Sequence, residues 1–430
     1  MKDICVIGAG HVGLVSGVCF AELGSKLICV DNDTQKIKGL KRGILPFYEP
    51  GLEELVHQNM KQGRLSFTTS IEEGTRASDI IFIAVGTPQK PDGEADLTFV
   101  ERVSQETAKA IDKYKLIVEK STVPVKTGSW IRRTMRLNNA YNIDFDVASN
   151  PEFLREGSAI EDFMKPDRIV IGVENKRAAD IMTELYSPLN APIMVTNIET
   201  AELIKHASNS FLALKISYIN AIANICEKVG GDVTQVAEGM GYDKRIGREF
   251  LNAGIGYGGY CFPKDLSAFT KVAEEVGYDF ELLKAAQKIN DLQRQQIVRK
   301  VKSVLWNLKG KTIGILGLSF KPNTDDIREA PSIEIIRQLQ EDGAQIKAYD
   351  PQAMNNAKKV LHNVEYYSNP YQIAEDSDAL VIITEWGEFK KLDLLRVKQL
   401  LRQSVIIDGR NILAPAEMKV LGFSYTGVGR

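Results

Sequence analysis

The sequence predicts an α/β protein with two doubly wound domains joined by a long central helix. Three observations support this fold class. A Gly-x-Gly-x-x-Gly turn lies between an N-terminal strand and a helix, a second series of strands repeats that organisation in the C-terminal third, and a long helical stretch without proline or glycine lies between them.

Composition restricts the class of protein. The chain has 430 residues, of which 44% are hydrophobic and 26% charged, as expected for a globular protein of two or three domains. The first strand starts at residue 3, which leaves no room for a signal peptide, and no apolar stretch is long enough to span a bilayer. A net charge of −2 offers no basic field for nucleic acid. We therefore expect a cytoplasmic protein with a small-molecule partner, no nucleic acid and no membrane.

The N-terminal segment has the pattern of a dinucleotide-binding unit. Residues 3–7 form an apolar strand, and residues 12–23 have helical apolar spacing. Between them, Gly8 makes the turn, Gly10 admits a pyrophosphate to the helix N-terminus, and Gly13 allows close packing of helix and strand. The motif is weak alone, but its position between a strand and a helix favours a Rossmann-like domain over a merely structural turn.

An acidic residue at the end of the second strand indicates which dinucleotide binds. Residues 26–30 form this strand, and Asp31 follows 18 positions after Gly13. A carboxylate there accepts hydrogen bonds from the adenosine ribose and repels a 2′-phosphate, which favours NAD over NADP. Lys36 lies nearby and partly offsets that repulsion.

Two further strands end in small hydroxyl residues. Residues 79–85 lead to Thr87, and residues 115–120 lead to Thr122. Open α/β sheets bind ligands at the carboxyl ends of their strands, so both threonines are candidate cofactor neighbours. Turn residues before proline would fit the same positions.

The C-terminal third repeats the first. Residues 312–317, 346–350, 378–384 and 405–408 read as strands in the same order, but a longer loop replaces the glycine turn. Lys321, Arg328 and Arg410 lie at predicted strand ends, where cations can meet phosphates; solvated surface charges are the alternative.

A single helix is predicted between the two repeats. Residues 199–228 contain no proline or glycine and carry apolar residues at helical spacing, so a dimer interface is possible along this helix. Lys205 and Asn209 are four residues apart and share a face, which would direct both at one ligand; a solvated polar face is the alternative.

One cysteine differs from the other four. Cys261 follows the glycine-rich run of residues 254–259, which would let a substrate approach the sulfur closely, although a tight turn over a packed thiol is also possible. The others alternate with apolar residues in strands or helices. With no Cys-x-x-Cys pair and four scattered histidines, no metal site is expected.

The chain resembles the UDP-glucose/GDP-mannose dehydrogenase family, and within it the UDP-glucose 6-dehydrogenases, over essentially its whole length. The motifs that carry the resemblance occur in the family's order: Gly8-Ala9-Gly10-His11-Val12-Gly13, Val85-Gly86-Thr87-Pro88, Glu119-Lys120-Ser121-Thr122-Val123-Pro124, Asn150 to Gly157, the loop around Cys261, and Asp408-Gly409-Arg410. One position departs from the pattern: the family usually has serine before the catalytic cysteine, and this chain has Tyr260.

The resemblance implies a domain organisation and a set of site residues. It implies an NAD-binding domain at 1–198, a central helical and dimerisation region at 199–300 and a UDP-sugar-binding domain at 301–430, in a homodimer or larger homo-oligomer. The implied catalytic residues are Cys261, Glu152, Lys205, Asn209, Asp265 and Thr122. Those implied or indicated for NAD are Gly8, Gly10, Val12, Gly13, Asp31, Lys36, Thr87, Thr122, Glu156, Lys264 and Arg328. Those for the nucleotide sugar are Glu152, Phe153, Leu154, Arg155, Glu156, Lys205, Asn209, Arg245, Phe250, Leu251, Asn252, Ala253, Gly254, Gly258, Lys321 and Arg410.

The chemistry of these residues fits a four-electron oxidation of UDP-glucose to UDP-glucuronate. A thiolate at Cys261 would trap the intermediate aldehyde and give a thioester, and Glu152 would act as general base for the water that cleaves it. Lys205 and Asn209 would donate to the developing oxyanion. The alternatives are the same chemistry on GDP-mannose or a UDP-N-acetylhexosamine, and a non-catalytic NAD-binding sensor, which would have no need of these side chains together.

Overall fold

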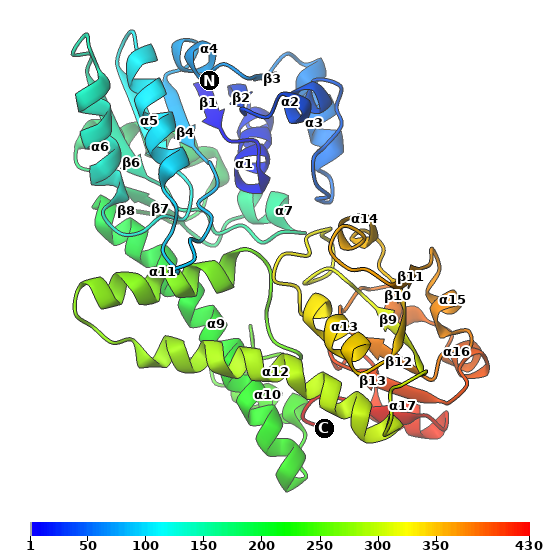
Figure 1. Cartoon of the computed structure of the whole chain (residues 1–430). Coiled ribbons are helices and arrows are strands. Elements are labelled where there is room, and N and C mark those ends of the chain that lie inside the picture. The colour runs from blue at the N-terminus through cyan, green and yellow to red at the C-terminus, as the bar shows by residue number, and fades with distance from the viewer. Residues whose placement is uncertain (1) are drawn as a thin grey trace. The chain divides into compact units, whose positions relative to one another are not determined.

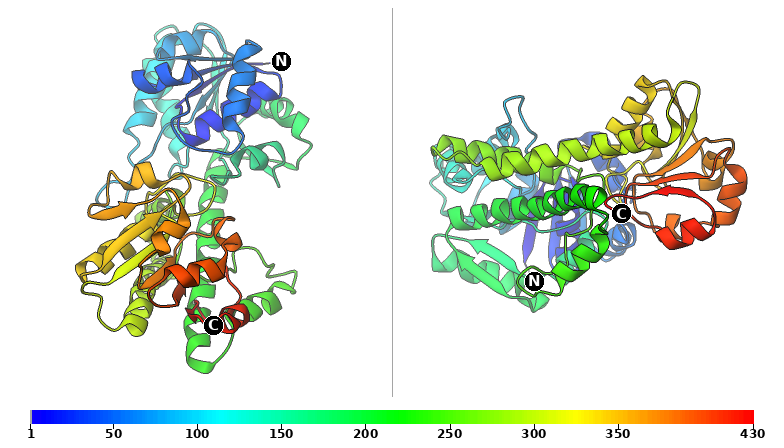
Figure 2. Two further views of the ribbon diagram at one scale, coloured as in Figure 1. Left: turned by 90° about the vertical axis from the view of Figure 1, so that its right-hand side faces the viewer. Right: turned by 90° about the horizontal axis from the view of Figure 1, so that it is seen from below.

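The computed structural model describes residues 2–430, which divide into two compact units. Unit 1 contains the residues up to Ser208 together with Ser267–Tyr278, and unit 2 contains Asn209–Leu266 and Asp279–Arg430. Two helices, α9 (Ile198–Val229) and α11 (Cys261–Glu275), contribute residues to both units. Figures 1 and 2 show α9 as one uninterrupted helix, which confirms the predicted long central helix.

Unit 1 is built on an eight-stranded sheet in the order β3-β2-β1-β4-β5-β6-β7-β8. The strands are β1 (Asp3–Ile7), β2 (Lys26–Val30), β3 (Leu65–Thr68), β4 (Ile80–Ile83), β5 (Lys115–Glu119), β6 (Phe145–Ser149), β7 (Ile169–Gly172) and β8 (Ile193–Thr196). Neighbouring strands are parallel except at the β6–β7 pair. The carboxyl ends of β1, β4, β5 and β6 therefore meet at one edge of the sheet, where the predicted ligand-binding residues follow the strands.

Helices cover both faces of this sheet (Figure 1). They are α1 (His11–Glu22), α2 (Thr34–Leu40), α3 (Leu52–Lys61), α4 (Ile71–Arg76), α5 (Thr98–Ala110), α6 (Thr127–Asn138), α7 (Ala159–Met164), α8 (Lys176–Tyr186) and the short η1 (Ser187–Leu189). One core joins α1, α3, α7 and α8 to one side of the strands, and a second core joins α5 and α6 to the other. The central strands are buried on both faces, as in a doubly wound sheet.

Unit 2 contains a second sheet of six parallel strands in the order β11-β10-β9-β12-β13-β14. The strands are β9 (Thr312–Leu316), β10 (Gln345–Tyr349), β11 (Val364–Tyr366), β12 (Ala379–Ile382), β13 (Val405–Asp408) and β14 (Ser424–Thr426). This order matches that of the first six strands of unit 1. The predicted repeat of the doubly wound fold is confirmed.

The helices of unit 2 complete its core. They are α10 (Val233–Gly241), α12 (Glu281–Leu305), α13 (Pro331–Glu341), α14 (Met354–Ala357), α15 (Pro370–Ala374), η2 (Phe389–Lys391), α16 (Leu394–Leu400) and α17 (Pro415–Val420). Residues of α9, α12 and α13 pack on one side of the second sheet, and residues of α15, α16 and α17 pack on the other. No helix among the described residues is long and apolar enough to cross a membrane.

Candidate active site

The glycine turn after β1 has the shape of a dinucleotide-binding loop. Gly8 has a φ of +113°, and a Cβ there would lie 2.3 Å from the carbonyl oxygen of Ala84. A Cβ on Gly13 would lie 1.9 Å from the carbonyl oxygen of Gly8, so both positions require glycine. A Cβ on Gly10 would meet no atom within 4 Å. The start of α1 is therefore open beside Gly10, which fits a pyrophosphate at the helix N-terminus.

Asp31 organises this turn as well as carrying the charge predicted to meet the ribose. Its carboxylate accepts hydrogen bonds from the backbone N–H of Ala9 and of Asp33, each at 2.9 Å. Nζ of Lys36 lies 2.8 Å from the same carboxylate. The cation therefore neutralises Asp31 in this structure.

Thr87 and Thr122 lie together at the carboxyl edge of the first sheet. The Thr87 hydroxyl donates to the backbone carbonyl of Thr122 at 2.9 Å, and the Ser121 hydroxyl donates to that of Val85 at 2.8 Å. These bonds fix the loops after β4 and β5 to each other. Their roles toward a cofactor stay predictions.

Glu152 and Lys205 form a buried ion pair in unit 1, with 3.0 Å between a carboxylate oxygen and Nζ. The second carboxylate oxygen of Glu152 accepts from the backbone N–H of Leu154 at 2.5 Å. Phe153 stacks beneath two cations, with Nζ of Lys205 5.3 Å and the guanidinium carbon of Arg168 3.6 Å from its ring centroid. A carboxylate and an ammonium held in this way can serve as a general base and an oxyanion donor.

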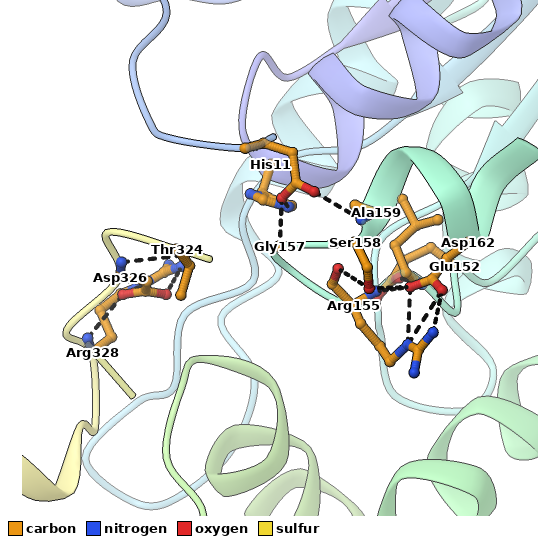
Figure 3. A network of polar contacts seen from close by, with 12 residues as sticks. His11, Glu152, Arg155, Gly157, Ser158, Ala159, Asp162, Thr324, Asp326 and Arg328 are labelled. Atoms are coloured by element: carbon orange, nitrogen blue, oxygen red, sulfur yellow. Dashed lines mark hydrogen bonds and ion pairs between the residues drawn. The ribbon is translucent and has the colours of Figure 1, made fainter. Parts of the chain in front are cut away.

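The segment that follows Glu152 is held by further polar contacts (Figure 3). The Arg155 guanidinium pairs with both carboxylate oxygens of Asp162, the shortest distance being 2.6 Å, and the Arg155 backbone N–H donates to the same group at 2.8 Å. Because this pairing occupies the Arg155 side chain, the expected substrate contact would involve the backbone or require the pair to open.

In unit 2, Cys261 is the first residue of α11. Of the five cysteines, it alone is not fully buried. Burial raises the pKa of the Cys19 and Cys29 thiols to about 12 and also raises the pKa of Cys5, which makes these groups poor nucleophiles. Cys261 differs from these buried thiols because it lies at a helix N-terminus, where the helix dipole favours a negatively charged sulfur.

The glycine run before Cys261 is required by its packing. Gly256 and Gly259 have φ angles of +91° and +81°, and a Cβ on Gly258 would lie 2.2 Å from the carbonyl oxygen of Glu329. The loop is thus a tight turn, but the thiol that follows is half-buried. The role of Cys261 as a nucleophile stays a prediction.

Asp265 joins two other predicted site residues. Its carboxylate accepts from the side-chain amide of Asn209 at 2.6 Å and lies 2.8 Å from Nζ of Lys264. All three side chains are buried. Glu152 and Lys205 belong to unit 1, whereas Asn209, Asp265 and Cys261 belong to unit 2.

Tyr260, the departure from the family pattern, lies between two cations. Nζ of Lys264 is 5.4 Å and the guanidinium carbon of Arg328 is 4.4 Å from the centroid of its ring. Arg328 is also paired with both oxygens of Asp326, at 2.6 and 2.9 Å (Figure 3). The bulk of the tyrosine is therefore accommodated by cation–π contacts.

The predicted substrate-binding residues of unit 2 differ in what their side chains can do. Leu251 and Ala253 are buried in the hydrophobic core, so only their backbones can meet a ligand. The Arg410 guanidinium donates to the carbonyls of Ile383, Gly256 and Phe320, at 2.8, 3.1 and 3.3 Å. Arg410 thus holds three loops together, a role that its sequence context did not reveal.

The remaining predicted substrate contacts are also placed within unit 2. Phe250 has a positive φ of 63°, the Asn252 amide oxygen accepts from Arg248 at 2.7 Å, and the Gly254 N–H donates to Asn220 at 2.8 Å. Nζ of Lys321 lies 5.6 Å from the centroid of the Phe320 ring. Arg245 is exposed and pairs with Asp243 at 2.6 Å. Their predicted contacts with a nucleotide sugar stay predictions.

Sequence reasoning missed several buried polar residues around the first sheet's carboxyl edge. Nζ of Lys120 donates to the amide oxygen of Asn150 at 3.0 Å and to the Tyr186 hydroxyl at 3.3 Å. Burial lowers the pKa of Lys120 to about 7. Glu49, in an irregular segment, contacts the start of α1. The positions of Lys120 and Asn150 at strand ends were a usable signal, but Glu49 carried none.

Comparison with known proteins decides the family. Three adjacent domains of the UDP-glucose/GDP-mannose dehydrogenase family match this chain: the NAD binding domain at residues 2–190, the central domain at 199–292 and the UDP binding domain at 314–415. The chain belongs to this family. It is accordingly an NAD-dependent dehydrogenase that acts on a UDP-sugar, and the resemblance and the cofactor predicted from sequence are confirmed.

Relatives within the family extend over the whole chain. A UDP-glucose 6-dehydrogenase of Bacillus subtilis is 53% identical over 431 residues, covering 100% of this chain and 94% of the relative. The structure of a UDP-glucose dehydrogenase from Pyrobaculum islandicum is 41% identical, with a TM-score of 0.94 and coverage of 100% and 98%. That of a UDP-D-ManNAc dehydrogenase from Pyrococcus horikoshii is 27% identical, with a TM-score of 0.88 and coverage of 99% of both chains.

Among the described residues, no cluster of histidine, cysteine, aspartate or glutamate side chains has the arrangement of a metal site.

Proposed function

We propose that this dehydrogenase oxidises UDP-glucose to UDP-glucuronate with two molecules of NAD, through a thiohemiacetal and a thioester on Cys261. The observation that carries the proposal is the state of the five thiols: Cys261 begins a helix and is half-buried, while the other four are buried. The similarity to UDP-glucose 6-dehydrogenases supports the choice of sugar.

The first domain fits the cofactor that the family uses. The open space beside Gly10, the helix start behind it and the carboxylate of Asp31 suit a pyrophosphate and a ribose. When bound, NAD supplies the oxidant for each of the two oxidations. Gly10, Asp31 and Thr122 would hold it, and the loops after β4 and β5 would exclude water from it.

The first oxidation leaves an aldehyde at C6 of the sugar. A base must remove the hydroxyl proton as the C–H bond is broken, and the buried pair of Asn209 and Asp265 offers a carboxylate with a fixed orientation for this or for placing water. The Cys261 thiolate then adds to the aldehyde carbon, which forms a C–S bond and an alkoxide. Lys205 and Asn209 would donate to that oxygen as its charge develops.

The second oxidation converts the thiohemiacetal into a thioester. Water must then attack the acyl carbon, and Glu152 would take its proton as the C–S bond breaks and the Cys261 thiolate leaves. The contact with Lys205 at 3.0 Å orients the Glu152 carboxylate. The products are a carboxylate at C6 and the regenerated thiol.

We further propose that two copies of the chain associate through α9. Phe211, Tyr218 and Ile225 recur every seven residues along this helix and are 61%, 51% and 53% exposed. An apolar seam at that spacing is typical of a helix that packs against another helix. Sedimentation velocity of Tyr218→Glu should then show a monomer, and a dimer at unchanged affinity would contradict this interface.

The substrate experiment is a panel of nucleotide sugars at equal concentration. UDP-glucose should give the highest kcat/KM, with UDP-N-acetylmannosamine, UDP-N-acetylglucosamine and GDP-mannose at least about tenfold lower, equivalent to about 1.4 kcal/mol. The fold shared with the UDP-D-ManNAc dehydrogenase makes the acetylated sugars the main alternative. A higher kcat/KM for one of them would overturn the choice of sugar.

A further inference from the structure

Glu49 is a buried carboxylate that bonds to two parts of the NAD-binding unit at once. It lies in the segment between α2 and α3, and its side chain has no exposed surface. Its Oε2 lies 3.0 Å from Nε2 of His11 and accepts from the backbone N–H of Gly157 at 2.7 Å. Its Oε1 accepts from the backbone N–H of Ala159 at 2.8 Å. Figure 3 labels the three residues that Glu49 contacts, His11, Gly157 and Ala159.

On one side, Glu49 holds the start of the cofactor-binding helix. His11 is the first residue of α1 and directly follows Gly10, whose surroundings are open. The His11 ring also packs on Phe47, with 4.7 Å between centroids. The segment around Glu49 therefore fixes the position of the helix N-terminus at which a pyrophosphate would bind.

On the other side, Glu49 caps α7 and holds the segment that follows Glu152. Ser158 occupies the N-cap of α7 but makes no capping hydrogen bond, because its hydroxyl lies 3.2 Å from the Asp162 carboxylate. Glu49 supplies the missing acceptor at Ala159. Gly157, with a φ of +82°, turns the chain so that its N–H also reaches Glu49.

We propose that Glu49 is a positioning residue that couples the cofactor-binding turn to the segment of residues 152–156. The proposal rests on the proposed function, in which that segment provides the base and contacts the nucleotide sugar. Two backbone N–H donors and the His11 ring converge on one carboxylate, so a shift of α1 on cofactor binding would be transmitted to the segment. Glutamine cannot replace it, because its amide N–H₂ would face one of the donors.

Hydrogen exchange followed by mass spectrometry tests this coupling without a sugar. NAD should slow exchange of the backbone amides of residues 152–158 by about fivefold or more in the wild-type chain, a coupling at the lower end of the usual range. In Glu49→Gln the same addition of NAD should change exchange by less than about twofold. If NAD protects the segment equally in Glu49→Gln and wild type, the proposal is overturned.

Two further variants make the result specific. His11→Ala removes the contact of Glu49 with α1 but leaves its bonds to Gly157 and Ala159. This variant should also lose the NAD-dependent protection. If Glu49→Gln folds poorly, His11→Ala tests the coupling in its place. Glu22→Gln is the matched control, because Glu22 accepts from Asn59 at 2.9 Å at the opposite end of α1. It should retain the protection. Loss of protection in Glu22→Gln as well would overturn a specific role for Glu49.

Kinetics separate this proposal from the proposed function. In Glu49→Gln, KM for NAD should rise and kcat should fall together, and Glu49→Asp, which keeps the charge, should recover part of both. A wild-type chain that makes no UDP-glucuronate would refute the proposed function and leave the exchange result standing. Normal kcat and KM in Glu49→Gln with an active wild type would refute the coupling alone.

Discussion

Glu152 and Lys205 are joined across the chain by a buried ion pair with 3.0 Å between charged atoms. Glu152 follows β6 and Lys205 lies in α9, so the pair links the carboxyl edge of the first sheet to the central helix. Both side chains are buried, so solvent screens the two charges little and each charge contributes to stabilising the other. This relationship gives the proposed base a defined orientation.

Replacing Glu152 by Gln should trap the covalent intermediate. The amide cannot take a proton from water, so thioester hydrolysis should slow by about 10²–10⁴-fold while the oxidations continue. Rapid mixing with NAD and UDP-glucose should show a burst of NADH, and intact-protein mass spectrometry should detect a UDP-glucuronyl adduct on Cys261. The wild type should show neither a burst nor an adduct. If the variant also showed neither, Glu152 would not be the base.

Replacing Asp31 by Ala should weaken NAD binding and reduce the ratio of NAD affinity to NADP affinity. The change removes an acceptor from Ala9 and releases Lys36, which can then meet a 2′-phosphate. We expect NAD affinity to fall by about 1–3 kcal/mol in a calorimetric titration. Asp33→Ala is the control, since Asp33 caps α2 through Gln35 and Lys36. That variant should lose stability but keep the NAD-to-NADP ratio.

Two glycines of one turn should respond differently to alanine. Gly10→Ala places a methyl group in open space, so it should cost less than about 1 kcal/mol of stability. It should nevertheless weaken NAD at least about tenfold, because the methyl group occupies the space beside the helix start. Gly13→Ala should destabilise the protein by about 1–3 kcal/mol, because its Cβ would overlap the Gly8 carbonyl. Thermal unfolding and NAD titration of both variants give the comparison.

Glu119 should make stability depend on pH. Burial raises the pKa of its carboxyl to about 8, from an ordinary 4.5. Between these values the folded chain holds a proton that the unfolded chain releases, so the contribution of Glu119 to stability is fully present below about pH 4.5 and is lost as the pH rises to about 8.

Glu119→Gln removes this dependence while preserving the side-chain shape. The free energy of unfolding of the variant, minus that of the wild type, should increase by up to about 1.4 kcal/mol per pH unit across that window. Urea denaturation at pH 5.5, 7.0 and 8.5 measures the difference. A constant difference at all three values would show that Glu119 is ionised in the folded state throughout.

The fold was largely predictable because its signals are local. The glycine turn, the apolar strands and the uninterrupted stretch of α9 each depend on residues close in sequence. The strand ends were less accurate: residues 79–85 were predicted, but β4 covers only Ile80–Ile83, because the apolar pattern continues into a loop that leaves the sheet. The reversal of β7 relative to β6 has no local signature.

The site was predictable only where a motif or a spacing marks it. Cys261 and Asp31 have such contexts, whereas the roles of Glu152 and Asp265 were available only through resemblance. Glu49 contacts residues more than 100 positions away, and a buried carboxylate in an irregular segment looks like a surface residue in sequence. Arg410 likewise serves three distant carbonyls, a pattern that tertiary packing alone creates.

The central claim is that one thiol carries the sugar between two oxidations, and the stoichiometry of NADH to UDP-glucuronate tests it most directly. The wild-type chain should form two NADH per UDP-glucuronate with no free aldehyde detectable by a carbonyl-trapping reagent. Cys261→Ala should bind NAD normally but should not form UDP-glucuronate. One NADH per sugar with accumulating aldehyde, or normal steady-state acid formation by Cys261→Ala, would contradict the covalent mechanism.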